Sequence, residues 1–357
     1  MKVNIINLDS GWILGKFAVR LQEELSKAGV ESVISRERKE SYDINHHVMF
    51  DFVNFTKHPH DTFMIAHVDQ NWHVRLLQDR LNKCGMGICM SEETMDKLTS
   101  YGLPRNKLCY VNPAHDHVMK PRKYIVGITH KCHNSIDFRK REDMLIDIAE
   151  QIDPGLFKFI IMGEGWENII TRLRELGIEV DYYDEFVYDK YTEIIPSLDY
   201  YFFFGMDEGS MGFLDALAAG VQTIVTPQGF HLDAKGGITY SGETVSDFVE
   251  IFNEIGEKKR KLIASVNEWT WENFARKHLE IWHYLLGDVE MAELYKNRGF
   301  YKDGIFSVLP EDYSVHSFLV NEIQNRDYKK IAGRIIKKGK RVSRIFDDSE
   351  KRIRESE

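Results

Sequence analysis

Long apolar runs and closely spaced cysteines are both absent from this 357-residue sequence. A transmembrane helix needs about 18 consecutive apolar residues, and no run reaches that length. Asn4, Asn7 and Asp9 interrupt the N-terminal stretch in which a secretory signal would require an apolar core. The four cysteines form no C-x-x-C pair, which indicates a reducing compartment. We therefore expect a cytoplasmic protein without disulfides or membrane spans.

Proline and glycine are also scarce, with 8 and 25 residues, which excludes collagen-like and low-complexity sequences. Hydrophobic residues make up 43% and charged residues 29% of the chain, as is usual for folded globular proteins. At about 150 residues per domain, the length predicts two globular domains and an appendage.

Positive charge is scarce in most of the chain and is concentrated near its end. The whole sequence carries a net charge of −9, which argues against general nucleic-acid binding. Residues 326–346 contain nine Lys or Arg and one acid, whereas residues 1–325 carry a net charge of −15. The basic segment predicts an anionic partner for this part of the chain alone.

Strand and helix patterns alternate regularly along most of the chain. A strand pattern over residues 2–8 is followed by a loop and by a helix pattern over residues 17–28, and a second series begins with a strand over residues 123–129. Short connections between such elements favour parallel sheets covered by helices. We expect an α/β fold with two Rossmann-like doubly wound domains, residues 1–120 and 121–268, that face each other across a cleft.

The most informative stretch spans residues 207–233. Gly209, Ser210 and Gly212 lie between a very apolar strand and a helix, where free backbone N–H groups can bind a phosphate. A tight turn that merely requires glycine is the alternative explanation. Two acids, Asp207 and Asp215, bracket the turn and favour a ligand site.

This stretch resembles the donor-site signature of retaining GT-B glycosyltransferases of the family 4 type, in which two acids flank a glycine-rich turn. The sequence DALAAGVQTIV stands where the family has an EAMAxGxPVI helix and strand. The resemblance implies that Asp215 holds the ribose hydroxyls and that either Asp207 or Glu208 orients the sugar. The implied donor-binding turn consists of Gly209, Ser210, Met211 and Gly212.

The similarity extends over most of residues 1–286. Residues 90–116 resemble the end of the family's first domain, and residues 269–286 resemble its closing helix, which crosses back onto the first domain. Residues 287–357 would then form a C-terminal extension with a basic amphipathic segment.

Two cations are the best match to the family's pyrophosphate-binding pair. These are Arg139 and Lys140, and fixed cations of this kind stabilise the charge that grows on a diphosphate leaving group. The match departs from the family at Ile128, where an arginine is common, and at Arg141, where glycine is usual. A solvated helix start is the alternative for this charged run.

In the first domain, the segment DSGWILGK resembles the family's glycine-containing loop, which closes over the donor phosphates. Gly15 would approach the donor closely and Lys16 would add a third cation. His67 follows a strand and matches the family's histidine beside the transferred sugar. The alternatives are a plain surface loop and a core histidine bonded to the backbone.

Clustered histidines also raise the question of a metal. His130, Cys132 and His133 are close in sequence, as are His115 and His117, but no second pair stands at zinc-like spacing. The family's enzymes need no divalent cation. We therefore expect no metal and no cofactor, with the nucleotide-diphosphate sugar bound as a substrate.

The resemblance implies a metal-independent, retaining hexosyltransferase that transfers a sugar from a nucleotide-diphosphate donor to a hydroxyl acceptor, in polysaccharide or glycolipid assembly at the inner face of the membrane. A non-catalytic nucleotide-sugar-binding subunit that activates a partner is the alternative. A nicotinamide-dependent dehydrogenase would need a G-x-G-x-x-G after a first strand, and neither domain opens with one.

The basic segment 326–346 has an apolar side and a basic side on a helical wheel. The apolar side consists of Tyr328, Ile331, Ile335, Val342, Ile345 and Phe346. This pattern is typical of a helix lying on an anionic membrane, although Gly333 and Gly339 lower its intrinsic helicity. A solvated tail or a docking segment for a protein partner is the alternative.

Deletion of residues 326–357 tests the membrane hypothesis. We expect the shortened protein to keep its turnover on a soluble acceptor but to lose binding to anionic liposomes, because the tail would serve location and not chemistry. Binding of the full chain should weaken as salt shortens the Debye length from about 10 Å at 0.1 M towards about 3 Å at 1 M. A full chain that ignores anionic liposomes at low salt would point to a protein partner instead.

Overall fold

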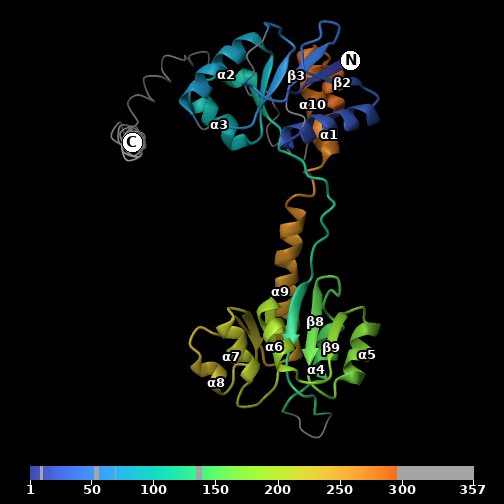
Figure 1. Cartoon of the computed structure of the whole chain (residues 1–357), viewed down its shortest axis with the longest axis vertical. Helices are drawn as coiled ribbons and strands as arrows, with labels where there is room; N and C mark the ends of the chain where they lie inside the picture. Colours follow the sequence, from blue (N-terminus) through green and yellow to red (C-terminus); the bar gives the residue numbers. More distant parts are fainter. Residues whose placement is uncertain (9–10, 52–55, 69, 134–138, 296–357) are drawn as a thin grey trace, which may run out of the picture. The chain divides into compact units, whose positions relative to one another are not determined.

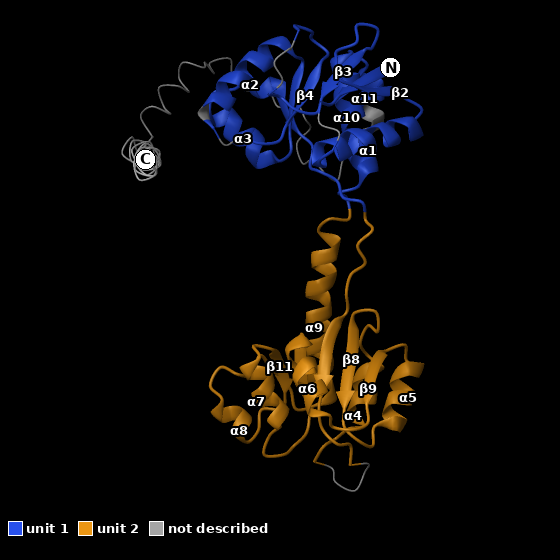
Figure 2. Cartoon of the chain, viewed as in Figure 1, with its two compact units in different colours: residues 1–116, 268–357 blue, residues 117–267 orange. Residues whose placement is uncertain are grey.

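The computed structural model describes residues 1–8, 11–51, 56–68, 70–133 and 139–295. The chain divides into two compact units (Figures 1 and 2): unit 1 comprises residues 1–116 together with the chain from residue 268 onward, and unit 2 comprises residues 117–267. The predicted boundaries after residues 120 and 268 lie close to these points. The predicted basic helix lies outside the described residues.

Unit 1 is built on a six-stranded parallel sheet with the strand order β2-β1-β3-β4-β5-β6. Its strands are β1 (Lys2–Ile6), β2 (Glu31–Ser35), β3 (Ile44–His47), β4 (Thr62–Ile65), β5 (Met86–Cys89) and β6 (Leu108–Tyr110). Its helices are α1 (Ile13–Lys27), α2 (Asn71–Lys83), α3 (Glu92–Ser100), the short 3-10 helix η1 (Arg105–Lys107), α10 (Trp271–Leu285) and α11 (Val289–Tyr295).

Alternate strand residues of unit 1 pack on opposite faces of its sheet, as the two-residue period of a strand requires. Met64 belongs to the core formed with α1 and α10, whereas its neighbours Phe63 and Ile65 belong to the core formed with α2 and α3. Together with α1, α10 therefore covers one face of the first sheet, although it follows unit 2 in the sequence. Trp282 of this helix is fully buried and donates a hydrogen bond to Thr62.

Unit 2 has a second six-stranded parallel sheet, with the order β12-β11-β10-β7-β8-β9. Its strands are β7 (Tyr124–Ile128), β8 (Phe157–Met162), β9 (Glu179–Tyr183), β10 (Tyr200–Phe203), β11 (Gln222–Val225) and β12 (Tyr240–Ser241). Its helices are α4 (Met144–Ala149), α5 (Glu167–Glu175), α6 (Tyr188–Ile194), the 3-10 helix η2 (Ile195–Ser197), α7 (Met211–Ala218), α8 (Phe230–Asp233) and α9 (Val245–Ala264).

Helices cover both faces of the second sheet as well. Phe202 and Phe252 belong to the core under α4, α5 and α9, and Tyr201 and Phe213 belong to the core under α6 and α7. The predicted fold class, two Rossmann-like doubly wound α/β domains, is confirmed by these two covered parallel sheets.

One local prediction needs correction, and one helix was not predicted. The loop expected up to residue 16 is wrong, because α1 already begins at Ile13. Leu14 lies three residues before Phe17 and packs with it in the same core, so the apolar stripe of the helix extends further back than predicted. The 20-residue α9 is an additional helix, and its start is marked by a capping box between Thr244 and Asp247.

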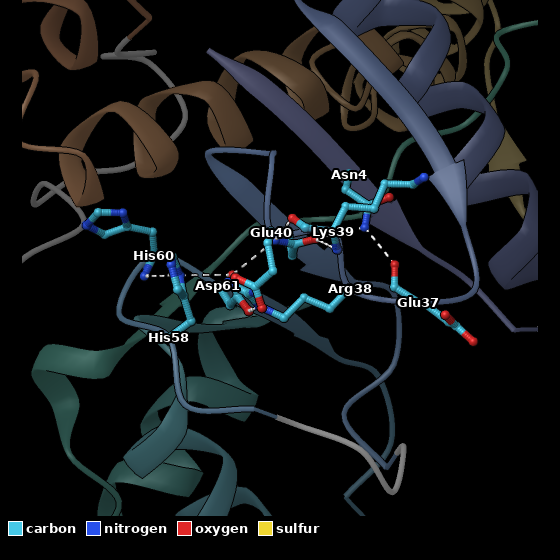
Figure 3. Close-up of polar contacts among 9 residues, drawn as sticks. Asn4, Glu37, Arg38, Lys39, Glu40, His58, His60 and Asp61 are labelled. Carbon is cyan, nitrogen blue, oxygen red and sulfur yellow. Dashed lines mark hydrogen bonds and ion pairs between the residues drawn. The ribbon is translucent and has the colours of Figure 1, made fainter.

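A buried polar network joins separate segments of unit 1 (Figure 3). Asn4 of β1 donates to the side-chain oxygen of Asn45 of β3 at 2.8 Å, and Arg38 donates from Nε to Oδ2 of Asp61 at 2.7 Å. His58 Nδ1 lies 3.2 Å from the other oxygen of Asp61. Because each buried group depends on a partner from another segment, the network favours one register of these strands.

Among the helices of the described residues, none is long and apolar enough to cross a membrane. The four cysteines are buried and form no disulfide, and each lies in the core of its unit.

Several buried histidines are neutral in the folded protein. Burial lowers the pKa of His278 and of His47 to about 4, and lowers that of His46 well below its ordinary value of 6.5. Unfolding restores the ordinary pKa, so below about pH 6.5 the unfolded chain takes up protons that the folded chain does not. Their contribution to stability is therefore present above pH 6.5 and is lost as the pH falls towards 4.

We expect the free energy of unfolding of the wild type to fall between pH 7 and pH 4.5, and we expect His278→Phe to reduce that fall. One pKa unit corresponds to about 1.4 kcal/mol, and phenylalanine keeps the aromatic packing against Phe274 and Trp282 without a titrating group. Urea unfolding at several pH values measures the effect, with the exposed His67→Gln as the control. An unchanged pH dependence in His278→Phe would contradict this origin.

Candidate functional site

The strand order of unit 2 reverses its direction at β7, between β8 on one side and β10 on the other. The chain moves from β7 outward through β8 and β9, and then returns to the other side of β7 with β10. In doubly wound sheets, ligands bind beyond the carboxyl ends of the strands at such a switch point. The segments that leave β7 and β10 there contain Arg139, Lys140 and residues 207–212.

Backbone donors are available at the start of α7, which follows β10. The N–H groups of Gly209, Met211 and Gly212 donate no hydrogen bond within the part of unit 2 that the structure describes. The first turn of a helix carries partial positive charge, so these groups favour an anion. Ser210 differs, because its N–H donates to Nε2 of His231 at 2.8 Å.

A chain of buried hydroxyl groups fixes the position of this helix start. The hydroxyl of Tyr201 lies 2.6 Å from the Ser210 hydroxyl and 3.1 Å from the Thr129 hydroxyl, which follows β7. Ser210 thus joins α7 to both strands of the switch point. Its hydroxyl and its N–H are both engaged within unit 2. Of the predicted donor turn, only Gly209, Met211 and Gly212 have N–H groups that donate no hydrogen bond within the described part of unit 2.

His231 of α8 holds the same turn from the other side. Its Nε2 accepts the N–H of Ser210, so Nδ1 carries the proton and donates to the Thr226 carbonyl oxygen at 3.1 Å. Burial lowers the pKa of His231, which favours the neutral ring that this arrangement needs. The position of Ser210 therefore depends on a neutral histidine.

Close packing explains the glycines of this segment. A Cβ at Gly212 would lie 2.4 Å from the Tyr201 hydroxyl, and a Cβ at Gly229 would lie 2.0 Å from the carbonyl oxygen of Glu208. Gly209 has a φ of 129°, a conformation that side chains rarely adopt. Each glycine lets another part of the chain approach the turn.

The predicted cation pair converges on one carboxylate. Arg139 Nη1 lies 3.7 Å from Oδ1 of Asp207, and Lys140 Nζ lies 3.5 Å from Oδ2. The Glu208 N–H donates to Oδ1 at 2.9 Å. This backbone hydrogen bond, together with the two cations, lowers the pKa of Asp207, which remains ionised at neutral pH.

The two neighbouring acids are arranged differently. The carboxylate of Glu208 is exposed, and within the described residues it forms no ion pair. Of the two candidates for the first acidic role, Asp207 is therefore the one beside the cations. Asp215 is exposed on α7 and accepts a hydrogen bond from the Tyr191 hydroxyl, and burial together with this bond raises the pKa of Tyr191.

The candidate residues of the first domain lie in unit 1. Gly15 is buried in the first turn of α1, and Lys16 pairs with Asp116 and lies 5.8 Å from the ring centre of Trp271. The loop predicted at both residues is wrong, because α1 places them in its first turns. Their predicted contacts with the donor stay a prediction. His67 is exposed and follows β4 by two residues.

No three His, Cys, Asp or Glu side chains among the described residues come together as a metal ligand set. His130 follows β7, and its two ring nitrogens are buried without hydrogen-bond partners in the structure. Burial, with the nearby Lys140, lowers the pKa of His130 to about 3.

Sequence reasoning did not include His231 or Tyr191 among the site residues. Their hydrogen-bond partners, Ser210 for His231 and Asp215 for Tyr191, are more than 20 residues away in the chain. No local spacing signals these hydrogen bonds, because they depend on how α6, α7 and α8 pack together.

The sequence matches no protein-family model and no curated protein. Among solved structures, the chain is similar to Anabaena HepE in complex with UDP-glucose, with 12% identity, a TM-score of 0.31, and coverage of 83% of this chain and 98% of HepE. For sucrose-phosphate synthase from Thermosynechococcus elongatus, the values are 10% identity, a TM-score of 0.32, and coverage of 80% and 99%.

A third similar structure is WaaG, a glycosyltransferase involved in lipopolysaccharide biosynthesis. It is 10% identical, with a TM-score of 0.31 and coverage of 82% of this chain and 99% of WaaG. At these identities and TM-scores the matches do not assign an activity to the chain, so its function has to be inferred from its own residues.

Gly212→Ala tests the packing that places the start of α7. The new methyl group would lie 2.4 Å from the Tyr201 hydroxyl and 2.5 Å from the Thr129 hydroxyl, so the helix or both side chains must shift. We expect a loss of about 1–3 kcal/mol in the free energy of unfolding, measured by urea titration. Leu214→Ala, at an exposed position of the same helix, serves as the control. Equal stability of Gly212→Ala and the wild type would contradict the close packing.

Proposed function

We propose that the protein is a glycosyltransferase that transfers a sugar from a nucleotide-diphosphate donor to a hydroxyl acceptor with retention of configuration. The observation that carries the proposal is the meeting of Arg139, Lys140 and Asp207 at a switch point, beside three N–H groups that donate no hydrogen bond within the described part of unit 2. Two fixed cations and a helix start suit a diphosphate. The resemblance of residues 207–233 to a donor signature supports the same chemistry.

In this proposal the leaving diphosphate lies against the cations and the start of α7. The bond between the anomeric carbon and the diphosphate oxygen breaks, and the acceptor oxygen forms the new bond on the same face. The acceptor proton passes to an oxygen of the departing diphosphate. Arg139 and Lys140 stabilise the negative charge that grows during this step, so no protein nucleophile is required.

The acids take roles that fit their positions. Asp207 pairs with the two cations and, once the diphosphate has engaged them, orients the sugar hydroxyls as a hydrogen-bond acceptor. Asp215, exposed and oriented by Tyr191, holds the ribose hydroxyls. His67 of unit 1 remains the proposed contact to the transferred sugar or the acceptor. A glycan or glycolipid acceptor follows from the family resemblance alone.

Removal of either cation tests the proposal. We expect Arg139→Ala and Lys140→Ala each to lower donor turnover by about 10²–10³-fold, because each removes one preorganised charge from the leaving group. Hydrolysis and transfer are measured over a panel of nucleotide sugars in buffer with EDTA, because the proposed chemistry needs no divalent cation. Binding of the nucleoside diphosphate product by calorimetry gives a second readout.

Arg172→Ala provides the matched control, because this arginine forms ion pairs with Glu150 and Glu175 on the surface of the same unit. It should leave turnover unchanged. Turnover close to the wild-type value in both cation variants would overturn the assignment of the diphosphate site. Activity that EDTA abolishes and Mg²⁺ restores would overturn the metal-independent mechanism.

A further inference from the structure

Arg141 adopts a backbone conformation that favours glycine. Its φ is 54°, and among the non-glycine residues that the structure describes it shares a positive φ only with His117. A residue with a Cβ pays on the order of 1 kcal/mol or more for this conformation. Favourable contacts of the Arg141 side chain must offset this cost in free energy.

The guanidinium of Arg141 makes those contacts with three segments. Nε donates to the carbonyl oxygen of Phe204 at 2.8 Å, and Nη2 donates to the same oxygen and to the Thr226 hydroxyl at 2.9 Å. Nη1 donates to the carbonyl oxygen of Glu243. These acceptors follow β10, β11 and β12, so one side chain links the carboxyl ends of three neighbouring strands.

The same short segment carries the two cations of the candidate site. Arg139 accepts the N–H of Met206 at its carbonyl oxygen, and Arg139 and Lys140 contact Asp207 through their side chains. Residues 139–141 thus run along residues 204–207. The guanidinium of Arg141 fixes one end of this contact, and the ion pairs lie at the other end.

We propose that Arg141 is a positioning residue that holds Arg139 and Lys140 in place beyond the carboxyl ends of the strands of the second sheet. This inference rests on the proposed function for the role of those two cations. Arg141 does not itself bind the diphosphate, because its Nε and both terminal nitrogens already donate to acceptors of the protein. It acts through the backbone that it ties to β10.

Arg141→Gly separates positioning from folding. Glycine relieves the strained φ, which offsets part of the stability lost with the hydrogen bonds, while the bonds from the guanidinium to Phe204, Thr226 and Glu243 are removed. We expect kcat to fall by on the order of 10–100-fold, because small displacements of charged groups have effects of this size. Added methylguanidinium should restore part of the activity of Arg141→Gly and none of any other variant.

Two further variants complete the experiment. Arg141→Lys keeps the charge but not the forked donors, so its kcat should lie between those of the wild type and Arg141→Gly. Arg174→Ala removes a guanidinium that bonds the Val180 carbonyl oxygen elsewhere in unit 2, and it should leave kcat unchanged. Wild-type kcat and KM in Arg141→Gly would overturn the proposal.

Hydrogen exchange measured by mass spectrometry tests the same contact without any substrate. The Met206 N–H is bonded to Arg139, so peptides covering residues 204–207 should exchange faster in Arg141→Gly than in the wild type. Unchanged exchange would overturn the proposal. If the wild type turns over no nucleotide sugar, the proposed function fails, and the exchange result alone decides whether Arg141 holds this segment.

Discussion

The placement of the α7 start against β7 and β10 is the constraint on which the candidate site depends. The Tyr201 hydroxyl contacts Ser210 on the helix and Thr129 beyond β7, and only a hydrogen atom fits at Gly212 beside them. A helix start displaced by one ångström would aim its free N–H groups elsewhere. Buried hydroxyl groups and the lack of a side chain at Gly212 therefore determine where the N–H groups at the start of α7 point.

The charges of Arg139, Lys140 and Asp207 partly balance one another beside the start of α7. Asp207 neutralises part of the charge of Arg139 and Lys140, and its carboxylate is stabilised by a backbone N–H as well as by the cations. Two cations without a nearby acid would repel each other and would tend to turn towards solvent. When an anionic ligand enters this cluster, Arg139 and Lys140 exchange their contacts with Asp207 for contacts with the ligand. The cations therefore need little reorganisation.

The sequence is informative where a feature is local. Apolar periodicity predicts most strands and helices of both units, and the spacing of Asp207 and Asp215 around a glycine turn identifies the region of interest. The prediction of a loop at Gly15 is wrong. The glycine and the polar residues before it are typical of a loop, but the apolar stripe of α1 begins at Leu14. His231, Tyr191 and the contacts of Arg141 could not be predicted, since their partners come from segments distant in the chain.

The insertion of unit 2 between two parts of unit 1 has a consequence for synthesis on the ribosome. The core of unit 1 includes Trp271, Phe274 and Trp282, which are made only after all of residues 117–267. At about 5–20 residues per second, roughly 8–30 s pass between the two parts. Unit 2 can fold during this interval, whereas one face of the first sheet is covered by α1 but not yet by α10. The apolar residues of unit 1 that pack against α10 are therefore buried only after unit 2 has been made.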